Sequence, residues 1–189
     1  MLLLAALPLA ACSEATPETD GSIEIPIADL NPEQKAMFDL AKEAAGGLGK
    51  AMVGELTQTL SADGPVAAIE QCRLRAPEAL AQASADMPGI HAIGRTSHRL
   101  RNPENSPPAW AAETVAAADG KPHAFTGEDD RLHVLLPIPI QPACLVCHGA
   151  PEVLPEALKA ELLVNYPHDQ ATGFQPEDLR GWFWVEVNP

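Results

Sequence analysis

Apolar residues recur every three or four positions in two stretches of the first half of the chain, and this spacing is typical of helices. The first stretch follows Asn31-Pro32-Glu33, which combines an N-cap asparagine with a proline at the first helical position. Gly46-Gly47 is expected to bend or interrupt this helix before it resumes through Leu60. The pattern predicts that the folded domain begins near residue 31.

The second stretch starts at Asp63-Gly64-Pro65 and places Ile69, Cys72 and Leu80 on one apolar face. Pro77 is expected to kink or split this helix, because proline has no amide hydrogen to donate to the preceding turn. Cys72 is therefore predicted to lie on the buried side of a helix.

From residue 91 the pattern changes from helical to extended. The segment HAIGRTSHRLRN, residues 91–102, is rich in arginine and hydroxyl residues and predicts an extended stretch that stops before Pro103. A short helix is expected over residues 107–119, with Gly120 at its end.

Residues 121–140 contain two apolar runs around the turn 127–129, which predict a β-hairpin. Pro137 and Pro139 indicate that its second strand is an edge strand or ends there. The remaining expected elements are a helix at 155–165, a loop at 166–181 and a closing strand at 182–187. Helices first and antiparallel strands later predict the α+β class, in one domain over residues 31–189.

The N-terminus, MLLLAALPLAACSEATPETDGS, begins with eleven apolar residues, too few to span a bilayer. Residues 1–11 are similar to a lipoprotein signal peptide, with Cys12 as the lipidated residue, so we expect a periplasmic protein anchored to a bacterial membrane. No Lys or Arg precedes the apolar run, which leaves the true start open, and an ordinary cleaved signal with Cys12 as a bystander is the alternative. Residues 12–30 are polar and predict a flexible tether.

The chain carries 12 basic and 26 acidic residues, a net charge of -14. Such a surface repels nucleic acid and anionic lipid head groups, and a partner attracted by charge should be basic. The alternative is that the acidity serves solubility alone.

The stretch PACLVCHGA contains Cys144 and Cys147 at the C-x-x-C spacing, with His148 directly after them. This arrangement is what covalent attachment of one haem c requires: two thiols for its vinyl groups and an imidazole for its iron. A redox disulfide would sit in a βαβ pattern that the chain lacks, and a zinc site would need a second ligand pair that is not present.

If His148 binds one side of the iron, the residue on the other side decides the chemistry. Apart from Met1, three methionines precede the motif, Met37, Met52 and Met87, and none follows it. Cys72 is an unassigned thiol in an exported protein, and a thiolate on an apolar helix face is costly unless a metal stabilises it. From composition alone, Cys72 could equally be a small buried apolar residue or the link of a disulfide-bonded dimer.

Four pieces of the sequence resemble the PAS-like family of single-haem c-type cytochrome domains. This family was long catalogued as a domain of unknown function and also occurs as the sensory part of bacterial signalling proteins. The pieces are AIEQC at 68–72, GRTSHRLRNPEN at 94–105, ACLVCHG at 143–149 and YPHDQATGFQPEDLRGWFWV at 166–185. Phe174 stands where the last motif commonly has Tyr, and Glu177 where Gly is usual.

The resemblance implies a PAS-like fold, a five-stranded antiparallel sheet flanked by helices, with His148 and Cys72 as the two axial ligands. Arg95, Arg99 and Arg101 in the second piece are candidates for charge-assisted bonds to the haem propionates, or else belong to a solvated strand face. A helical-bundle cytochrome with an open iron is the alternative fold.

Two classes of function fit these expectations. The first is a periplasmic electron carrier, with a low reduction potential because a thiolate opposite an imidazole favours ferric iron. The second is a haem-based redox or gas sensor that acts through a partner protein. We expect no enzymatic activity, since a peroxidase needs an open iron and distal acid-base residues that the sequence does not identify.

Overall fold

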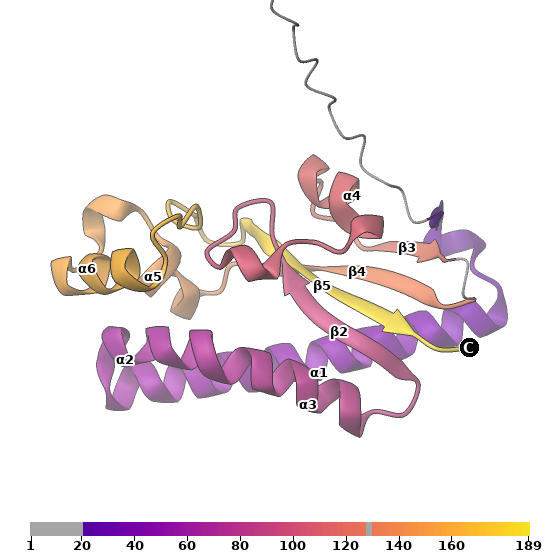
Figure 1. Ribbon diagram of the computed structural model, residues 1–189, viewed down its shortest axis with the longest axis horizontal. Helices are drawn as coiled ribbons and strands as arrows, with labels where there is room; N and C mark the ends of the chain where they lie inside the picture. The colour runs from indigo at the N-terminus through magenta and orange to yellow at the C-terminus, as the bar shows by residue number, and fades with distance from the viewer. Residues whose placement is uncertain (1–20, 128–129) are drawn as a thin grey trace, which may run out of the picture.

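The computed structural model describes residues 21–127 and 130–189, and its five strands form one antiparallel sheet in the order β1-β3-β4-β5-β2 (Figure 1). The strands are β1 (Ile23–Ile25), β2 (Ile90–Thr96), β3 (His123–Thr126), β4 (Leu132–Pro139) and β5 (Leu179–Val187). The α+β class and the five-stranded antiparallel sheet are as predicted. The expected signal peptide and the lipidation site at Cys12 lie outside the described residues.

Helices occupy both faces of the sheet and one of its ends. They are α1 (Pro32–Ala62), α2 (Gly64–Glu70), α3 (Ala76–Asp86), α4 (Ala112–Ala117), α5 (Leu145–His148) and α6 (Glu156–Asn165). Short 3-10 turns are η1 (Ile27–Asp29), η3 (Pro103–Asn105), η4 (Ala109–Ala111), η5 (Pro142–Cys144) and η6 (Pro151–Val153). Within the described residues, no helix is both long and apolar enough to cross a membrane.

Helix α1 starts where the sequence predicts, at a capping box. The Asn31 side chain accepts from the Gln34 amide at 2.9 Å, and the Gln34 side chain accepts from the Asn31 amide at 3.0 Å. The predicted break at Gly46-Gly47 is wrong, because α1 continues without interruption to Ala62. Both glycines face solvent while the opposite face packs on the sheet, and this packing outweighs their weak helix propensity.

The second predicted helix is split before Pro77. Residues Gln71–Arg75 form a π-helical turn between α2 and α3. Pro77 has no amide hydrogen for the carbonyl of Arg73, so the regular hydrogen-bond pattern cannot continue through this turn. Cys72 lies inside the π turn.

The predicted hairpin is β3 and β4, and of the two alternatives for its second strand, an edge or a terminus, the structure shows the terminus, since β4 ends at Pro139. Strand β4 lies between β3 and β5. Pairing with β3 reaches only as far as Leu135, so Pro137 and Pro139 lie beyond the end of β3, near the terminus of β4. Prolines are tolerated there because no β3 partner needs their missing amide hydrogen.

The ordered domain starts earlier than residue 31. Residues Ile23–Ile25 pair with Ala124–Thr126 of β3, and η1 follows directly. The prediction of a tether through residue 30 is therefore wrong for its last part. A three-residue strand is too short to show a period, and it forms because β3 offers a free edge.

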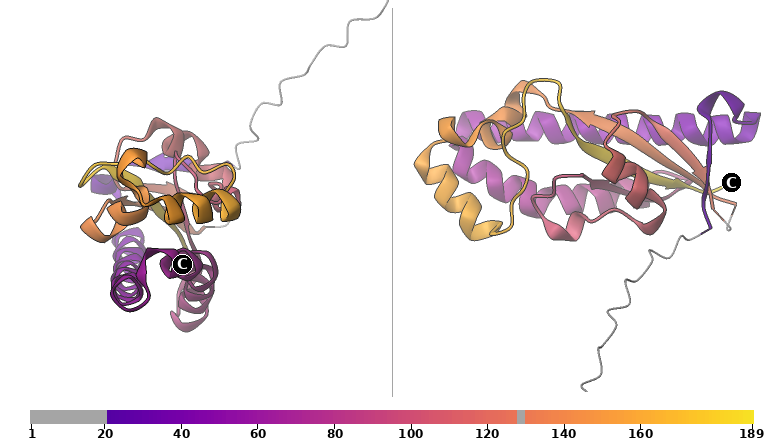
Figure 2. Two further views of the ribbon diagram at one scale, coloured as in Figure 1. Left: turned by 90° about the vertical axis from the view of Figure 1, so that its left-hand side faces the viewer. Right: turned by 90° about the horizontal axis from the view of Figure 1, so that it is seen from above.

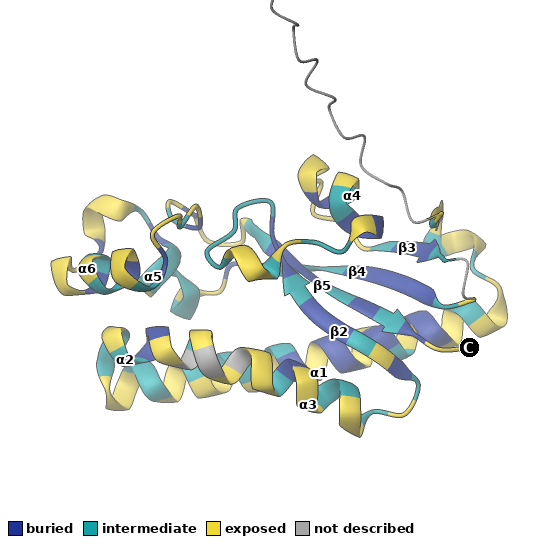
Figure 3. Cartoon of the chain, viewed as in Figure 1, coloured by how far each residue is buried: buried dark blue, intermediate teal, exposed yellow. Residues whose placement is uncertain are grey.

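The two faces of the sheet are covered by different elements. On one face α1 and α3 pack against apolar residues of β2, β4 and β5, and on the other α4 and η4 cover Trp182 of β5 (Figures 1 and 3). The segment α5, η6 and α6 lies beyond the end of the sheet, beside α2 (Figures 1 and 2). This end of the molecule brings the π turn and the cysteine motif together.

Candidate functional site

The cysteine motif lies where the chain leaves β4. Two short turns, η5 and α5, carry its two cysteines and its histidine. The amide of Gly149 closes α5 by donating to the carbonyl oxygen of Leu145 at 2.9 Å. A Cβ atom on Gly149 would lie 2.6 Å from that oxygen, so a side chain at this position would push the turn open.

Two contacts define the protonation state of His148. Its Nδ1 lies 2.6 Å from the carbonyl oxygen of Ala171, which can only accept, so Nδ1 carries the hydrogen. Its Nε2 lies 3.5 Å from Nε of Arg180, which can only donate, so Nε2 keeps its lone pair. Burial, helped by the charges of Arg180 and Arg101, lowers the pKa of His148 well below its ordinary value. The imidazole is neutral and offers Nε2 as a ligand atom.

Four residues from two distant parts of the chain line one cavity: Cys72, Cys144, Cys147 and His148. Burial raises the pKa of Cys144, and it raises the pKa of Cys147 to about 11, although Arg101 lies close to Cys147 and opposes the shift. Both thiols of the motif are therefore protonated at neutral pH.

The structure also bears on the disulfide and zinc alternatives. Cys72, Cys144 and Cys147 are all free thiols. In residues 21–127 and 130–189, no three His, Cys, Asp or Glu side chains come close enough together to hold a metal ion by themselves. The motif is thus arranged with two separate thiols and one imidazole facing the same cavity.

Cys72 reaches the cavity from the π turn, and Arg95 of β2 fixes this turn. The guanidinium Nη2 of Arg95 donates to the carbonyl oxygen of Cys72 at 3.0 Å. Burial lowers the pKa of Arg95, and no carboxylate in the described chain pairs with it. A π turn is common at functional sites because its extra residue redirects a side chain.

Met52 of α1 lines the same cavity and is a second candidate ligand opposite His148. Met37 and Met87 instead belong to the core between α1 and the sheet. The other histidines of the described chain do not line the cavity; they are His91, His98, His123, His133 and His168.

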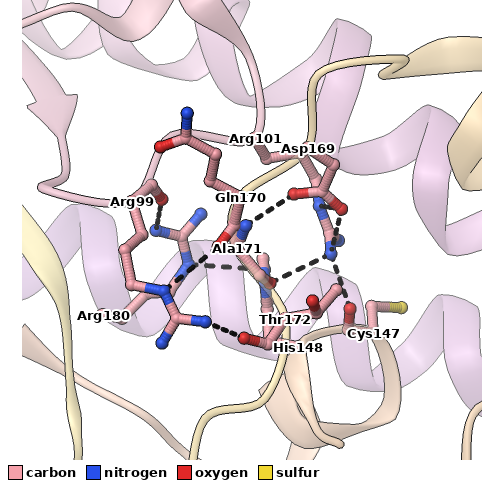
Figure 4. A network of polar contacts seen from close by, with 9 residues as sticks. All are labelled: Arg99, Arg101, Cys147, His148, Asp169, Gln170, Ala171, Thr172 and Arg180. Atoms are coloured by element: carbon pink, nitrogen blue, oxygen red, sulfur yellow. Dashed lines mark hydrogen bonds and ion pairs between the residues drawn. The ribbon is translucent and has the colours of Figure 1, made fainter. Parts of the chain in front are cut away.

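Arg101 ties the cysteine motif to the loop that contains Ala171 (Figure 4). It forms an ion pair with Asp169 at 2.9 Å and donates to the carbonyl oxygens of Cys147 at 2.6 Å and of Ala171 at 3.2 Å. Asp169 in turn accepts from the Ala171 amide at 2.7 Å. Arg101 lines the cavity, and its Nε and Nη2 position the carbonyl that orients His148.

Arg99 is directed to the same loop from outside the cavity. It donates to the carbonyl oxygens of Gln170 and Thr172, and its guanidinium lies 4.2 Å from the centre of the Phe174 ring. Phe174 packs edge-on against His148, with ring centres 6.2 Å apart. Arg99 is therefore a support for the histidine and not a lining residue.

Arg180, at the start of β5, lines the cavity and was not among the predicted site residues. Burial, together with the charges of Arg101 and Arg95, lowers its pKa to about 10. In the described chain it has no carboxylate partner. Its nitrogens contact Nε2 of His148 at 3.5 Å and the carbonyl oxygen of Arg99 at 3.4 Å, and its guanidinium lies 5.6 Å from the centre of the Phe174 ring. A buried cation of this kind indicates that an anionic group belongs in the cavity.

Tyr166 is a second lining residue that sequence analysis missed. It caps the end of α6 and is buried, which raises its pKa. The only sequence signal for Tyr166 or Arg180 was their position inside the last matching motif. Neither spacing nor periodicity shows that their side chains meet.

The fold and the site define an α+β protein with one five-stranded antiparallel sheet and a thiol-lined cavity at its end. The structure is similar to "Crystal structure of the cyanobacterial heme-protein Tll0287", with a TM-score of 0.60 and 22% identity over 85% of this chain and 97% of that chain. At this identity the likeness shows a shared fold. A search of curated proteins finds no match.

The family model described as Tll0287-like matches residues 50–188. The chain therefore belongs to the Tll0287-like family. This membership supports the resemblance to a haem-protein family that the sequence motifs indicated.

Proposed function

We propose that this chain is an exported c-type cytochrome that carries one covalent haem on a PAS-like fold and transfers electrons in the periplasm. One observation carries the proposal: His148 is held as the neutral Nδ1–H tautomer, with its Nε2 and the thiols of Cys144 and Cys147 at one cavity. The haem of the related Tll0287 protein supports the same cofactor for this chain.

The residues present fit a haem c. Cys144 and Cys147 would form the two thioether links, and His148 would bind the iron through Nε2. Arg180, a buried cation without a carboxylate partner, would pair with a propionate. Arg95 lines the same cavity and is the second candidate for this role.

Cys72 is the proposed second axial ligand. It lies on the cavity wall that the π turn forms, and Arg95 holds its backbone carbonyl in place. Met52 of α1, which lines the same cavity, is the competing ligand. The bound iron would supply one-electron redox chemistry, and thiolate ligation would keep its reduction potential below that of a His/Met cytochrome.

A redox or gas sensor is the alternative, and the position of Cys72 in a π turn supports it. Arg95 holds the π turn at the Cys72 carbonyl, and loss of this hydrogen bond would let the turn move and withdraw the Cys72 sulfur from the cavity. In a carrier, Arg95 would keep the turn in place in both oxidation states.

The export signal and a lipid anchor at Cys12 complete the proposal, since c-type haem is attached outside the cytosol. The net charge of -14 favours a basic redox partner.

Electron paramagnetic resonance of the ferric protein tests the ligand assignment. The wild type should give a low-spin thiolate signal that Cys72→Ser abolishes and Met52→Leu leaves intact. A low-spin signal of imidazole/thioether type that Met52→Leu alters and Cys72→Ser leaves intact would assign Met52 instead. Carbon monoxide then separates the two functions: an unchanged spectrum of the ferrous protein supports a carrier, and ready binding supports a sensor.

A further inference from the structure

Helix α6 carries large apolar residues on its inner side and on its outer side. On its inner side Leu158 and Leu162 are buried in a cluster that Cys147 also contacts. On its outer side Leu163 and Val164 are 67% and 77% exposed, and the other outward residues include Ala157 and Ala160. Apart from Glu156, the fully exposed positions of α6 are therefore apolar, and no element of the described chain covers Leu163 and Val164.

The exposed apolar side chains gather at this end of the molecule. The large ones in the described chain are Ile23, Val66, Val146, Val153, Leu163 and Val164. Four of them belong to the segment 146–164, and Val66 belongs to α2, which packs against α6 (Figure 1). Single exposed apolar residues are ordinary, but their collection on α6 and its neighbours is typical of an interaction surface.

The charges within the segment that carries this surface are mainly acidic. Residues 150–166 contain three carboxylates, Glu152, Glu156 and Glu161, and one basic residue, Lys159. Nζ of Lys159 donates to Glu156 at 2.7 Å, so this cation is already paired. A second copy of this chain, with a net charge of -14, would bring like charges together here, and an anionic membrane would be repelled.

We propose that the outer side of α6, together with Val153, is a docking surface for a basic protein that presents an apolar patch surrounded by Lys and Arg side chains. The inner side of the same helix packs against Cys147, so a docked protein would lie about one helix diameter, ~10 Å, from the motif. The claim that this partner exchanges electrons rests on the proposed function. The docking itself does not.

The test uses the mature full-length protein, labelled with nitrogen-15, and a small basic cytochrome c as the probe. Amide shift changes on adding the probe should map to α6 and η6, and the affinity should fall as salt is added. The double substitution Leu163→Ser/Val164→Ser should weaken binding about tenfold. Ile23→Ser is the matched control, because Ile23 is equally exposed, at 68%, but lies in β1.

Shift changes elsewhere, or equal affinity for the double variant and the wild type, would overturn the proposal. If sedimentation velocity shows self-association that the double substitution abolishes, the occupant of the surface is a second copy of this chain. If the protein binds vesicles of anionic phospholipid, the occupant is a membrane. Either result would overturn the proposal of a basic protein partner. The amide shift changes report binding and need no electron transfer, so their absence would overturn only the docking surface. The absence of a c-type haem spectrum would overturn the proposed function instead.

Discussion

The imidazole Nδ1 of His148 lies 2.6 Å from the carbonyl oxygen of Ala171, a residue that is 23 positions away in sequence. The same carbonyl accepts from Arg101, and the Ala171 amide donates to Asp169. A backbone oxygen therefore sets the tautomer of the histidine, and the largely buried ion pair of Arg101 and Asp169 holds that oxygen in position. The loop that contains Ala171 therefore leaves Nε2 of His148 unprotonated and able to bind a metal.

Removing the carboxylate of this ion pair should destabilise the protein. Asp169→Ala leaves Arg101 nearly buried and without its partner, so we expect a loss of about 3 kcal/mol in the free energy of unfolding. Urea denaturation measures it. Asp39→Ala removes an exposed ion pair with Lys35 and should leave the midpoint unchanged. Equal midpoints for both variants would show that the loop is held in another way.

Gly149 should be intolerant of any side chain. In Gly149→Ala the new Cβ would meet the Leu145 carbonyl at 2.6 Å, so α5 must shift, at a cost of roughly 1–3 kcal/mol. Gly46→Ala is the control, since nothing lies within 4 Å of a Cβ there, and it should stabilise α1 by about 0.5–1 kcal/mol. Thermal unfolding compares the two variants, and an unaffected Gly149→Ala would contradict the close contact.

Arg180 should raise the reduction potential of the mature protein. A buried cation stabilises the more negative ferrous form, so Arg180→Gln should lower the potential, whereas Arg180→Lys keeps the charge and should change it less. Potentiometric titration measures both. An unchanged potential in Arg180→Gln would place Arg180 away from the haem.

His123, through its hydrogen bond with Glu24 of β1, should make the stability of the fold depend on pH. Desolvation alone would lower the pKa of His123, but the hydrogen bonds that its ring nitrogens donate to Glu24 and Asp119 raise it overall. Because the folded pKa is the higher one, this stabilisation is complete below the unfolded value, about 6.5, and is lost as the pH rises through the folded value. Unfolding midpoints across this window should fall in the wild type and change less in Glu24→Gln. If the unfolding midpoints of the wild type and of Glu24→Gln fall in parallel with pH, the contact between His123 and Glu24 is not the cause of the pH dependence.

Much of the fold followed from local signals in the sequence. The cap at Asn31, the split before Pro77 and the β3–β4 hairpin were all predicted, because each depends on a few neighbouring residues. Strand β1 was missed because only its pairing with β3 makes it a strand. The break at Gly46-Gly47 was wrongly expected because tertiary packing overrides propensity.

The site was predictable only as far as its motifs. Cys144, Cys147 and His148 lie close together in one sequence motif, and Cys72 was conspicuous as a thiol without an assigned role. Arg180 became apparent only through its burial, which no spacing reveals. Arg99 was expected as a propionate partner, but the structure directs its guanidinium to the loop carbonyls and Phe174.

The most direct test of the central claim is the alkaline pyridine haemochrome spectrum of protein produced in a host that matures c-type cytochromes. We predict the bands of a haem with two thioether links, pigment that acidified acetone does not extract, and a shift toward a single link in Cys144→Ser or Cys147→Ser. A colourless protein, or haem that the solvent removes from the wild type, would contradict the account.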